Sequence, residues 1–305
     1  MKFCLEIWGT DYNKIQNVCI FAEKNGYDGF FYGESLANID LDCWTILSSL
    51  INITNKIKLG PVITYLFPEY RNIALIAKQA TTFQILSNGR LEFRTGTGAT
   101  LQYAVPWWNP YGIEYPKAVK RVELLNEGLY ILTRLWNKEL SSIKFKGKYF
   151  ELNYANINIP RVEIGKIPIT VAAKKKKSMN IAAKYADIWE SSYISPEEFF
   201  KLNNEFTNII DRGNDKKIVR SIELDVIIAE SVNHLEHKEK IFAMERGPYT
   251  LHQIRKYGLI GKPITIIDRI NEYREAGVNQ ILLAFQDPFD IRSLELFNDV
   301  IKRFK

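Results

Sequence analysis

The sequence has little that would cross-link the chain, span a membrane or bind a metal. Of its 305 residues, three are cysteines and three are histidines. An odd cysteine count without metal-ligand spacing argues against both a disulfide framework and a zinc centre. No stretch approaches the uncharged apolar run that a transmembrane helix needs. We therefore expect no membrane segment and no metal, and we expect the reducing cytoplasm as the location.

Charge and composition exclude few other classes. The net charge of +6 favours anionic ligands in general. One dense basic run, Lys174–Lys177, lies outside any zinc-finger or RNA-binding signature, so no nucleic-acid partner is expected. Glu6 places a charge inside what would be the apolar core of a signal peptide, which argues against secretion. The hydrophobic fraction of 46% and charged fraction of 25% are typical of a folded domain.

Predicted strands alternate with amphipathic helices along the whole chain. The strands are Lys2–Ile7, Phe30–Tyr32, Lys58–Ile63, Leu91–Thr95, Ile167–Ala172, Ile188–Ser191, Ser221–Ala229 and Gln280–Phe285. The helices are Asp11–Asn25, Asp42–Ile53, Asn72–Leu86, Pro116–Trp136, Lys177–Tyr185, Pro196–Arg212, Pro263–Ala276 and Ile291–Phe304. Ser87–Gly89 is a predicted helix stop, and Pro116 suits the first turn of its helix. Eight such units without a nucleotide fingerprint predict a single α/β domain, a (β/α)8 barrel; a doubly wound sheet is the alternative.

Two segments interrupt the alternation. Residues 137–166 contain the hairpin-like run Ile143–Phe150, and Ser231–Tyr257 has a largely helical pattern. Neither is flanked by a linker rich in proline, glycine or serine, so we interpret both as insertions within residues 1–305.

Ligands of a (β/α)8 barrel bind at the C-terminal ends of its strands, which selects candidates before any family is considered. Glu6, near the end of the first strand, is the candidate proton-handling group; an ion-paired structural acid is the alternative. The glycines of Gly96–Gly98 allow a planar ligand to approach the backbone closely, although a plain turn would also explain them. Lys174–Lys177 at a helix start would suit an anion, or would be a solvated basic loop.

Aromatic residues and histidines are weaker candidates. Trp107, Trp108 and Tyr111 follow the fourth strand and would line a substrate pocket or pack under a long loop. His234 and His237 are spaced to share a helical face, but their neighbours are typical of surface charge, so no metal site is predicted.

Several motifs together resemble one family nearly end to end. They are Ala22–Asp28, Ile57–Thr64, Leu86–Leu91 followed by Gly96–Gly98, Leu135–Trp136, Phe145–Phe150, Ala182–Asp187 and Tyr273–Val278. With them the chain resembles the bacterial-luciferase-like flavin and deazaflavin oxidoreductases, and among these the branch that uses coenzyme F420. That branch includes the methylenetetrahydromethanopterin reductases and the F420-dependent glucose-6-phosphate dehydrogenases.

The resemblance implies a set of site residues. A non-prolyl cis peptide in the third strand, here Val62–Ile63, would support the cofactor ring. The ring and the phosphate-bearing tail would together contact Glu34, Val62, Ile63, Thr97, Gly98, Ala172, Ala173, Lys174 and Lys175. Trp8, Trp107 and Trp108 would line the substrate pocket, and Glu6 would be catalytic. Family members commonly pair through barrel helices, so a homodimer is expected by analogy.

The sequence also departs from parts of the family. The sugar and alcohol dehydrogenases carry an acid where this chain has Ala99, and an Asp-His pair where it has Glu34 and Ser35. Hydroxyl oxidation is therefore not expected, since it needs a proton acceptor. The methylenetetrahydromethanopterin reductases carry an acid at the place of Glu6. We expect an F420-dependent reductase or dehydrogenase of a small organic substrate. The alternatives are an FMN-dependent monooxygenase supplied by a flavin reductase, and a non-catalytic cofactor-binding barrel.

Overall fold

The computed structural model describes residues 1–137, 139–157, 165–211 and 217–305. The chain divides into two compact units, which are described separately. The terminal unit comprises Met1–Phe31 and Trp189–Lys305, and the middle unit comprises Tyr32–Ile188. The strand β2 (Gly29–Gly33) begins in the first and ends in the second, and β8 (Ile188–Ser192) begins at the last residue of the middle unit.

The terminal unit contains, in chain order, β1 (Lys2–Ile7), α1 (Tyr12–Lys24), most of β8, α7 (Pro196–Ile210), β9 (Val219–Ile228), α8 (Val232–Arg246), α9 (Pro248–Tyr257), β10 (Leu259–Gly261), α10 (Pro263–Glu275), β11 (Gln280–Phe285) and α11 (Ile291–Ile301). Parallel pairs join β1 to β11, β11 to β9 and β9 to β10. Trp189 stacks on Phe206 with ring centroids 4.2 Å apart, which places the β8–α7 contact in the core.

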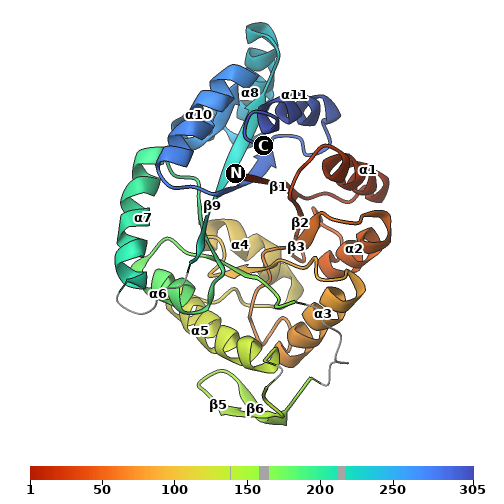
Figure 1. Cartoon of the computed structure of the whole chain (residues 1–305), viewed down its shortest axis with the longest axis vertical. Coiled ribbons are helices and arrows are strands. Elements are labelled where there is room, and N and C mark those ends of the chain that lie inside the picture. Colours follow the sequence, from red (N-terminus) through yellow and green to blue (C-terminus); the bar gives the residue numbers. More distant parts are fainter. Residues whose placement is uncertain (138, 158–164, 212–216) are drawn as a thin grey trace. The chain divides into compact units, whose positions relative to one another are not determined.

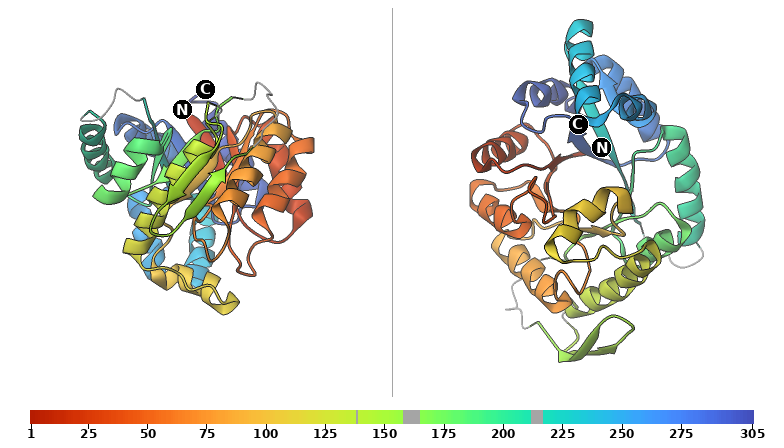
Figure 2. Two further views of the ribbon diagram at one scale, coloured as in Figure 1. Left: turned by 90° about the horizontal axis from the view of Figure 1, so that it is seen from below. Right: turned by 180° about the vertical axis from the view of Figure 1, so that it is seen from behind.

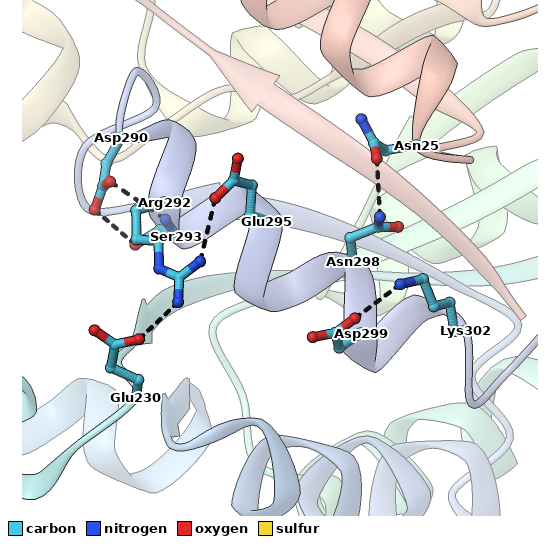
Figure 3. A network of polar contacts seen from close by, with 9 residues as sticks. All are labelled: Asn25, Glu230, Asp290, Arg292, Ser293, Glu295, Asn298, Asp299 and Lys302. Carbon is cyan, nitrogen blue, oxygen red and sulfur yellow. Dashed lines mark hydrogen bonds and ion pairs between the residues drawn. The ribbon is translucent and has the colours of Figure 1, made fainter.

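Polar contacts fix α11 within this unit (Figure 3). Arg292 pairs with Glu230 at the end of β9 at 2.7 Å. Asn298 donates to the side chain of Asn25, the C-cap of α1, at 2.9 Å. The last helix is therefore hydrogen-bonded to the first, as Figure 3 shows.

The middle unit contains α2 (Cys43–Leu50), a 3-10 turn at Ile51–Ile53, β3 (Lys58–Val62), α3 (Ile73–Leu86), β4 (Phe93–Gly96), α4 (Leu101–Trp108), a second 3-10 turn at Asn109–Tyr111, α5 (Ala118–Leu135), β5 (Ile143–Lys146), β6 (Glu151–Ala155), β7 (Ile169–Ala172) and α6 (Lys176–Tyr185). β4 pairs with β7 in parallel, and isolated bridges Leu59–Leu91 and Thr64–Thr95 join β3 to β4.

The strand order is β3-β2-β1-β11-β9-β8-β7-β4, with β10 paired to β9. Because bridges also join β3 to β4, both ends of this order are connected, which excludes the doubly wound alternative. The fold is thus the predicted (β/α)8 barrel, with alternating strands and helices labelled in Figure 1. No helix of the described residues is both long and apolar enough to cross a bilayer.

Local signals explain most element boundaries. Asp11 accepts from the backbone N–H of Lys14 and caps α1. The predicted helix stop at Ser87–Gly89 is confirmed, since α3 ends at Leu86. Asn88 and Gly89 both have positive φ, and the Gly89 N–H donates to the Gln84 carbonyl. Pro116 was expected in the first turn of its helix, but α5 begins at Ala118 with Lys117 as N-cap. Its ring instead fixes the approach to the helix.

Both segments that interrupt the alternation contain secondary structure within the described residues. The hairpin β5–β6 extends past Phe150 to Ala155 and lies beside α5 (Figure 2). The Glu127 carboxylate on α5 accepts from the N–H groups of Lys148 and Tyr149 in its turn. The segment 231–257 forms α8 and α9, whose Phe242 and Ile254 pack on Ile227 of β9. Residues 138 and 158–164 of the first predicted insertion, and Arg212 of the predicted helix Pro196–Arg212, lie outside the described residues.

Candidate functional site

Four carboxyl groups come together in the terminal unit and are called the acid cluster: Glu6, Glu190, Glu223 and Asp225. Glu6 lies on β1, Glu190 on β8 and the other two on β9. Glu223 and Asp225 are two residues apart and therefore face the same side of their strand. Between β1 and β9 lies β11, where the small residue Ala284 is paired with Asp225. Glu6 feels the charges of all three other members.

The partners of Glu6 and Glu223 differ. The two carboxyl groups influence each other's pKa. The Tyr193 hydroxyl also donates to Oε1 of Glu223, from a residue whose φ is +54° and whose N–H donates to the Glu223 carbonyl. The Oε2 atom of Glu6 is buried and accepts no hydrogen bond from the described residues. Glu6 therefore has one carboxyl oxygen that lacks a donor among the described residues.

The other two members of the cluster have separate donors. The Tyr257 hydroxyl donates to Oδ2 of Asp225 at 2.8 Å, and Arg246 also acts on this carboxylate through its charge. The Ser221 hydroxyl donates to Oε2 of Glu190 at 2.8 Å. These contacts give Asp225 and Glu190 hydrogen-bond donors. The charges of both groups still raise the pKa of Glu6.

Burial and mutual repulsion oppose ionisation of the cluster. Desolvation, followed by the charge of Glu223, raises the pKa of Glu6 well above its ordinary value. Desolvation and the charge of Glu190 raise the pKa of Glu223 to about 7, although the Tyr193 hydroxyl opposes that rise. Burial also raises the pKa of Asp225, against the hydrogen bond from Tyr257 and the charge of Arg246. The cluster therefore retains protons at pH values where ordinary carboxyl groups are ionised.

The terminal unit also contains a cavity of about 520 Å³. Its wall contains Trp8, which lies two residues after Glu6, together with the end of β9, residues 285–290 from the end of β11 onward, and residues of α8. Phe285 and Phe289 give it apolar walls. Arg246 also lines it, with its guanidinium 5.9 Å from the Trp8 ring centroid. A cavity of this size and lining could hold a small, partly aromatic molecule.

A second candidate site lies in the middle unit, at the C-terminal ends of β2, β3, β4 and β7. The Val62–Ile63 peptide bond is cis, as the resemblance implied. The Val62 carbonyl accepts from the N–H of Glu34 at 3.2 Å. A Cβ placed on Gly96 would come within 2.9 Å of the Ala172 Cβ and 3.4 Å of Ile63. We call these five residues, Glu34, Val62, Ile63, Gly96 and Ala172, the cis-peptide site.

Glu34 is surrounded by a cation and hydroxyl donors. Its carboxylate pairs with Arg71 at 2.8 Å and accepts from the Thr64 hydroxyl at 2.6 Å and from Tyr70 at 3.2 Å. Burial raises the pKa of Glu34, and Arg71 opposes that rise. These donors hold the carboxylate in place beside the cis peptide.

The two loops that follow β4 and β7 are arranged differently. Gly98 has φ +76°, and a Cβ there would collide with Tyr65 and Tyr115, so the close approach requires glycine. Thr97 beside it is half-buried. After β7, Ala173 is buried, while Lys174–Lys177 are exposed at the start of α6, one residue earlier than predicted. This places basic side chains at a helix N-terminus, where the helix dipole favours anions.

The tryptophans predicted to line a substrate pocket separate into different environments. Trp8 lines the cavity of the terminal unit. Trp108 is fully buried at the end of α4 among Tyr65, Phe67 and Tyr70, which is the packing alternative. Trp107 on the same helix is half-buried. Tyr111 is 49% exposed, and no group of potential metal ligands occurs in the part of the chain that the structure describes.

The chain is similar to a known family and to characterised proteins. A model of the family "Luciferase-like monooxygenase" matches residues 8–238. The 5,10-methylenetetrahydromethanopterin reductase of Methanopyrus kandleri is 24% identical over 354 aligned positions, covering 100% of this chain and 99% of that protein.

Solved structures give the same fold at lower identity. An F420-dependent secondary alcohol dehydrogenase, in complex with an F420-acetone adduct, superposes with a TM-score of 0.82 at 18% identity and covers 100% of this chain and 99% of its own. A monooxygenase from Streptomyces bottropensis superposes with a TM-score of 0.81 at 17% identity, with both chains fully covered. At these identities the likeness establishes the fold alone.

Proposed function

Since the chain belongs to the luciferase-like monooxygenase family, we propose that it is a coenzyme F420-dependent oxidoreductase that transfers a hydride between the deazaflavin and a small organic substrate. The observation that carries this proposal is the end-to-end similarity to the methylenetetrahydromethanopterin reductase, which covers nearly all of both chains. The relatives compared with it are reductases, dehydrogenases and monooxygenases, and the chain is accordingly an oxidoreductase.

The cis-peptide site and its two loops fit a cofactor of this kind. A flat ring needs backbone without side chains to approach, and Gly98 cannot carry a Cβ without displacing Tyr65 or Tyr115. Val62, Ile63 and Thr97 would contact the ring. Ala172, Ala173, Lys174 and Lys175 would hold the phosphate and the acidic tail, since ammonium groups and a helix N-terminus attract anions. When bound, the cofactor would supply the hydride chemistry.

Glu6 is the proton-handling residue in this proposal. Reduction of a double bond by hydride leaves a heteroatom that needs a proton, and a carboxyl group that stays protonated near neutral pH can donate it. Desolvation raises the pKa of Glu6, which suits this role. Glu34 does not compete for it, because Arg71 and Thr64 hold its carboxylate. With Ala99 and Ser35 at the places of the dehydrogenase acid/base groups, reduction is favoured over hydroxyl oxidation.

Substrate would bind in the cavity beside Trp8. Its aromatic walls suit a planar group, and Arg246 offers donors to polar atoms at its edge. Truncating Trp8 to alanine is expected to raise KM with deazaflavin affinity unchanged. A change in the unfolding temperature of the ligand-free Trp8→Ala variant would show that the indole serves packing instead.

An FMN-dependent monooxygenase is the second candidate, favoured by the matched monooxygenase structures. Oxygen separates the two, since reduced flavin reacts with it quickly and reduced deazaflavin does not. Fluorescence titration of the purified protein with coenzyme F420 and with FMN is the direct test. Tighter binding of F420 is the expected result, tighter binding of FMN would favour the monooxygenase, and binding of neither would overturn both.

We also propose a cytoplasmic homodimer. Cys4, Cys19 and Cys43 are buried and form no disulfide in the described residues, as a reducing compartment would require. The dimer is proposed from the family resemblance, and light scattering would measure it.

A further inference from the structure

Two cationic side chains of α8 line the cavity of the terminal unit, Lys238 and Arg246, and their partners differ. The Lys238 ammonium lies 2.7 Å from Oδ2 of Asp290, and the Ser293 hydroxyl donates to the same oxygen at 2.7 Å, a contact drawn in Figure 3. The Arg246 side chain donates no hydrogen bond and forms no ion pair with the described residues. Of the two cations, only Arg246 therefore has its N–H donors available to a ligand.

Aromatic rings fix where the Arg246 guanidinium lies. It is 5.9 Å from the centroid of the Trp8 ring and 5.7 Å from that of the Phe242 ring. Phe242 is buried and packs with Ile227 and Ile254, so this ring is held by the core of the unit. Cation–π attraction to both rings orders the guanidinium at the wall of the cavity, while no oxygen acceptor among the described residues occupies it.

The acids nearby do not occupy this guanidinium. Glu245 also lines the cavity, but it precedes Arg246 on α8, and adjacent helical residues do not face each other. Asp287 accepts from the N–H of Phe289 at 2.8 Å. Burial raises the pKa of Asp225, and the charge of Arg246 opposes that rise without an ion pair between the two residues.

The remaining wall is aromatic and closely set. Phe285 is buried at the end of β11, and Phe289 follows it. A Cβ on Gly9, the neighbour of Trp8, would come within 2.8 Å of the Phe289 ring, so glycine at this position lets the ring stand against the chain. Flat rings on several sides favour a planar ligand.

We propose that Arg246 binds a carboxylate of the substrate, so that the cavity selects a small planar carboxylic acid over a neutral molecule of the same shape. A guanidinium matches a carboxylate through two parallel N–H···O bonds, which fix the orientation of the ligand as well as its charge. Trp8, Phe285 and Phe289 would contact the planar part. The inference rests on the proposed function, which places the substrate in this cavity, and it names the chemical class of that substrate.

Calorimetric titration of the protein without cofactor tests this selection, with 2-naphthoate and the neutral 2-naphthamide as probes. The wild type should bind 2-naphthoate about tenfold more tightly at low salt. R246Q should lose this preference and keep its affinity for 2-naphthamide. R274Q is the matched control: Arg274 is also an exposed arginine in the last turn of a helix, 5.8 Å from the Phe304 ring, but lies outside the cavity wall. It should keep the wild-type preference.

Two further measurements separate charge from shape. R246K keeps the charge without the paired donors and should retain part of the preference. Added salt should reduce the preference of the wild type, because Arg246 is exposed. Equal affinity of the wild type for both probes would overturn the inference, as would a preference that survives in R246Q or binding of neither probe.

Titration with coenzyme F420 separates this inference from the proposed function. If F420 is not bound while the preference for 2-naphthoate depends on Arg246, the proposed function fails and the carboxylate site stands. If F420 is bound and the wild type does not distinguish the two probes, the proposed function stands and the carboxylate site is excluded.

Discussion

Glu6 and Glu34 are both glutamates near the ends of barrel strands, yet the charges and donors around them are opposite in kind. Glu34 in the middle unit has a guanidinium and two hydroxyl groups around it. Glu6 in the terminal unit has three other carboxyl groups around it and an oxygen without a donor. Burial raises the pKa of both groups, but the cation and hydroxyl donors oppose that rise for Glu34, whereas neighbouring carboxyl groups add to it for Glu6. Neighbouring donors, not residue type or depth, separate a structural acid from a chemical one.

The largest expected effect is on activity, which substitution of Glu6 should lower far more than substitution of Glu34. E6Q should lower kcat by roughly 10²–10⁴-fold, the usual contribution of a positioned acid, with the affinity for F420 unchanged. The rate of oxidation of reduced F420 with any substrate that the wild type reduces is the measurement. E34Q is the matched control, because it is expected to weaken folding without removing the alkaline limb of the pH–rate profile. If E34Q alone abolished that limb, the assignments would be reversed.

Arg71 tests the structural side of the comparison. R71M should lower the free energy of unfolding by about 3 kcal/mol, because it leaves the buried carboxylate of Glu34 without its cation. The double variant R71M/E34Q should regain part of this loss, since no uncompensated charge remains. Urea unfolding measures both. Equal stabilities of the single and double variants would contradict the pairing.

The pH dependence of stability tests the acid cluster. Burial raises the pKa of Glu223 from 4.5 to about 7, so the folded protein binds this proton more tightly than the unfolded chain. Its contribution to stability is therefore complete below pH 4.5 and decreases as the pH rises toward 7, by on the order of 2 kcal/mol. Urea unfolding at several pH values should show this slope in the wild type and a flatter slope in E223Q. The control E236Q removes an exposed carboxylate on α8 and should keep the wild-type slope. An equal slope in all three would exclude a raised pKa for Glu223.

The smallest expected effect concerns the basic loop of the middle unit. K174A/K175A should weaken F420 binding about tenfold at low salt, and the difference should shrink as salt rises, because exposed charges are screened. A double variant of two exposed lysines elsewhere, K240Q/K262Q, should bind F420 as the wild type does. A salt-independent loss would indicate that the loop acts through its shape.

The sequence predicts the barrel because its signals are local and repeated. Strand Lys2–Ile7 is predicted to the residue, as is the helix stop at Ser87–Gly89. Helix α4 was not predicted, because Pro106 and two tryptophans disguise its pattern. The strand β10 was also missed, since three residues carry no periodic signal and only its pairing with β9 defines it.

The site was predicted only in part, for a different reason. Glu6 was identified because an acid is conspicuous within an apolar strand. Glu223 and Asp225 were overlooked, although Ser221, Glu223 and Asp225 alternate with apolar residues within one strand. This period of two would usually indicate a solvent face. In a barrel the same pattern also arises from an interior polar face, and only the contacts among β1, β8 and β9 distinguish the two.

The division of the terminal unit into Met1–Phe31 and Trp189–Lys305 affects how the protein is made. Chains emerge from the ribosome from the N-terminus, and domains tend to fold as units in that order. The middle unit is one continuous stretch and has all its contacts available once residue 188 is synthesised. Strand β1 lies between β2 and β11 in the sheet, so one of its edges stays unpaired until β11 is synthesised, and the bond between Asn25 and Asn298 forms later still. Until then the apolar face of β1 needs shielding, so translation speed and chaperone supply should influence the yield of this protein more strongly than the stability of its finished fold would suggest.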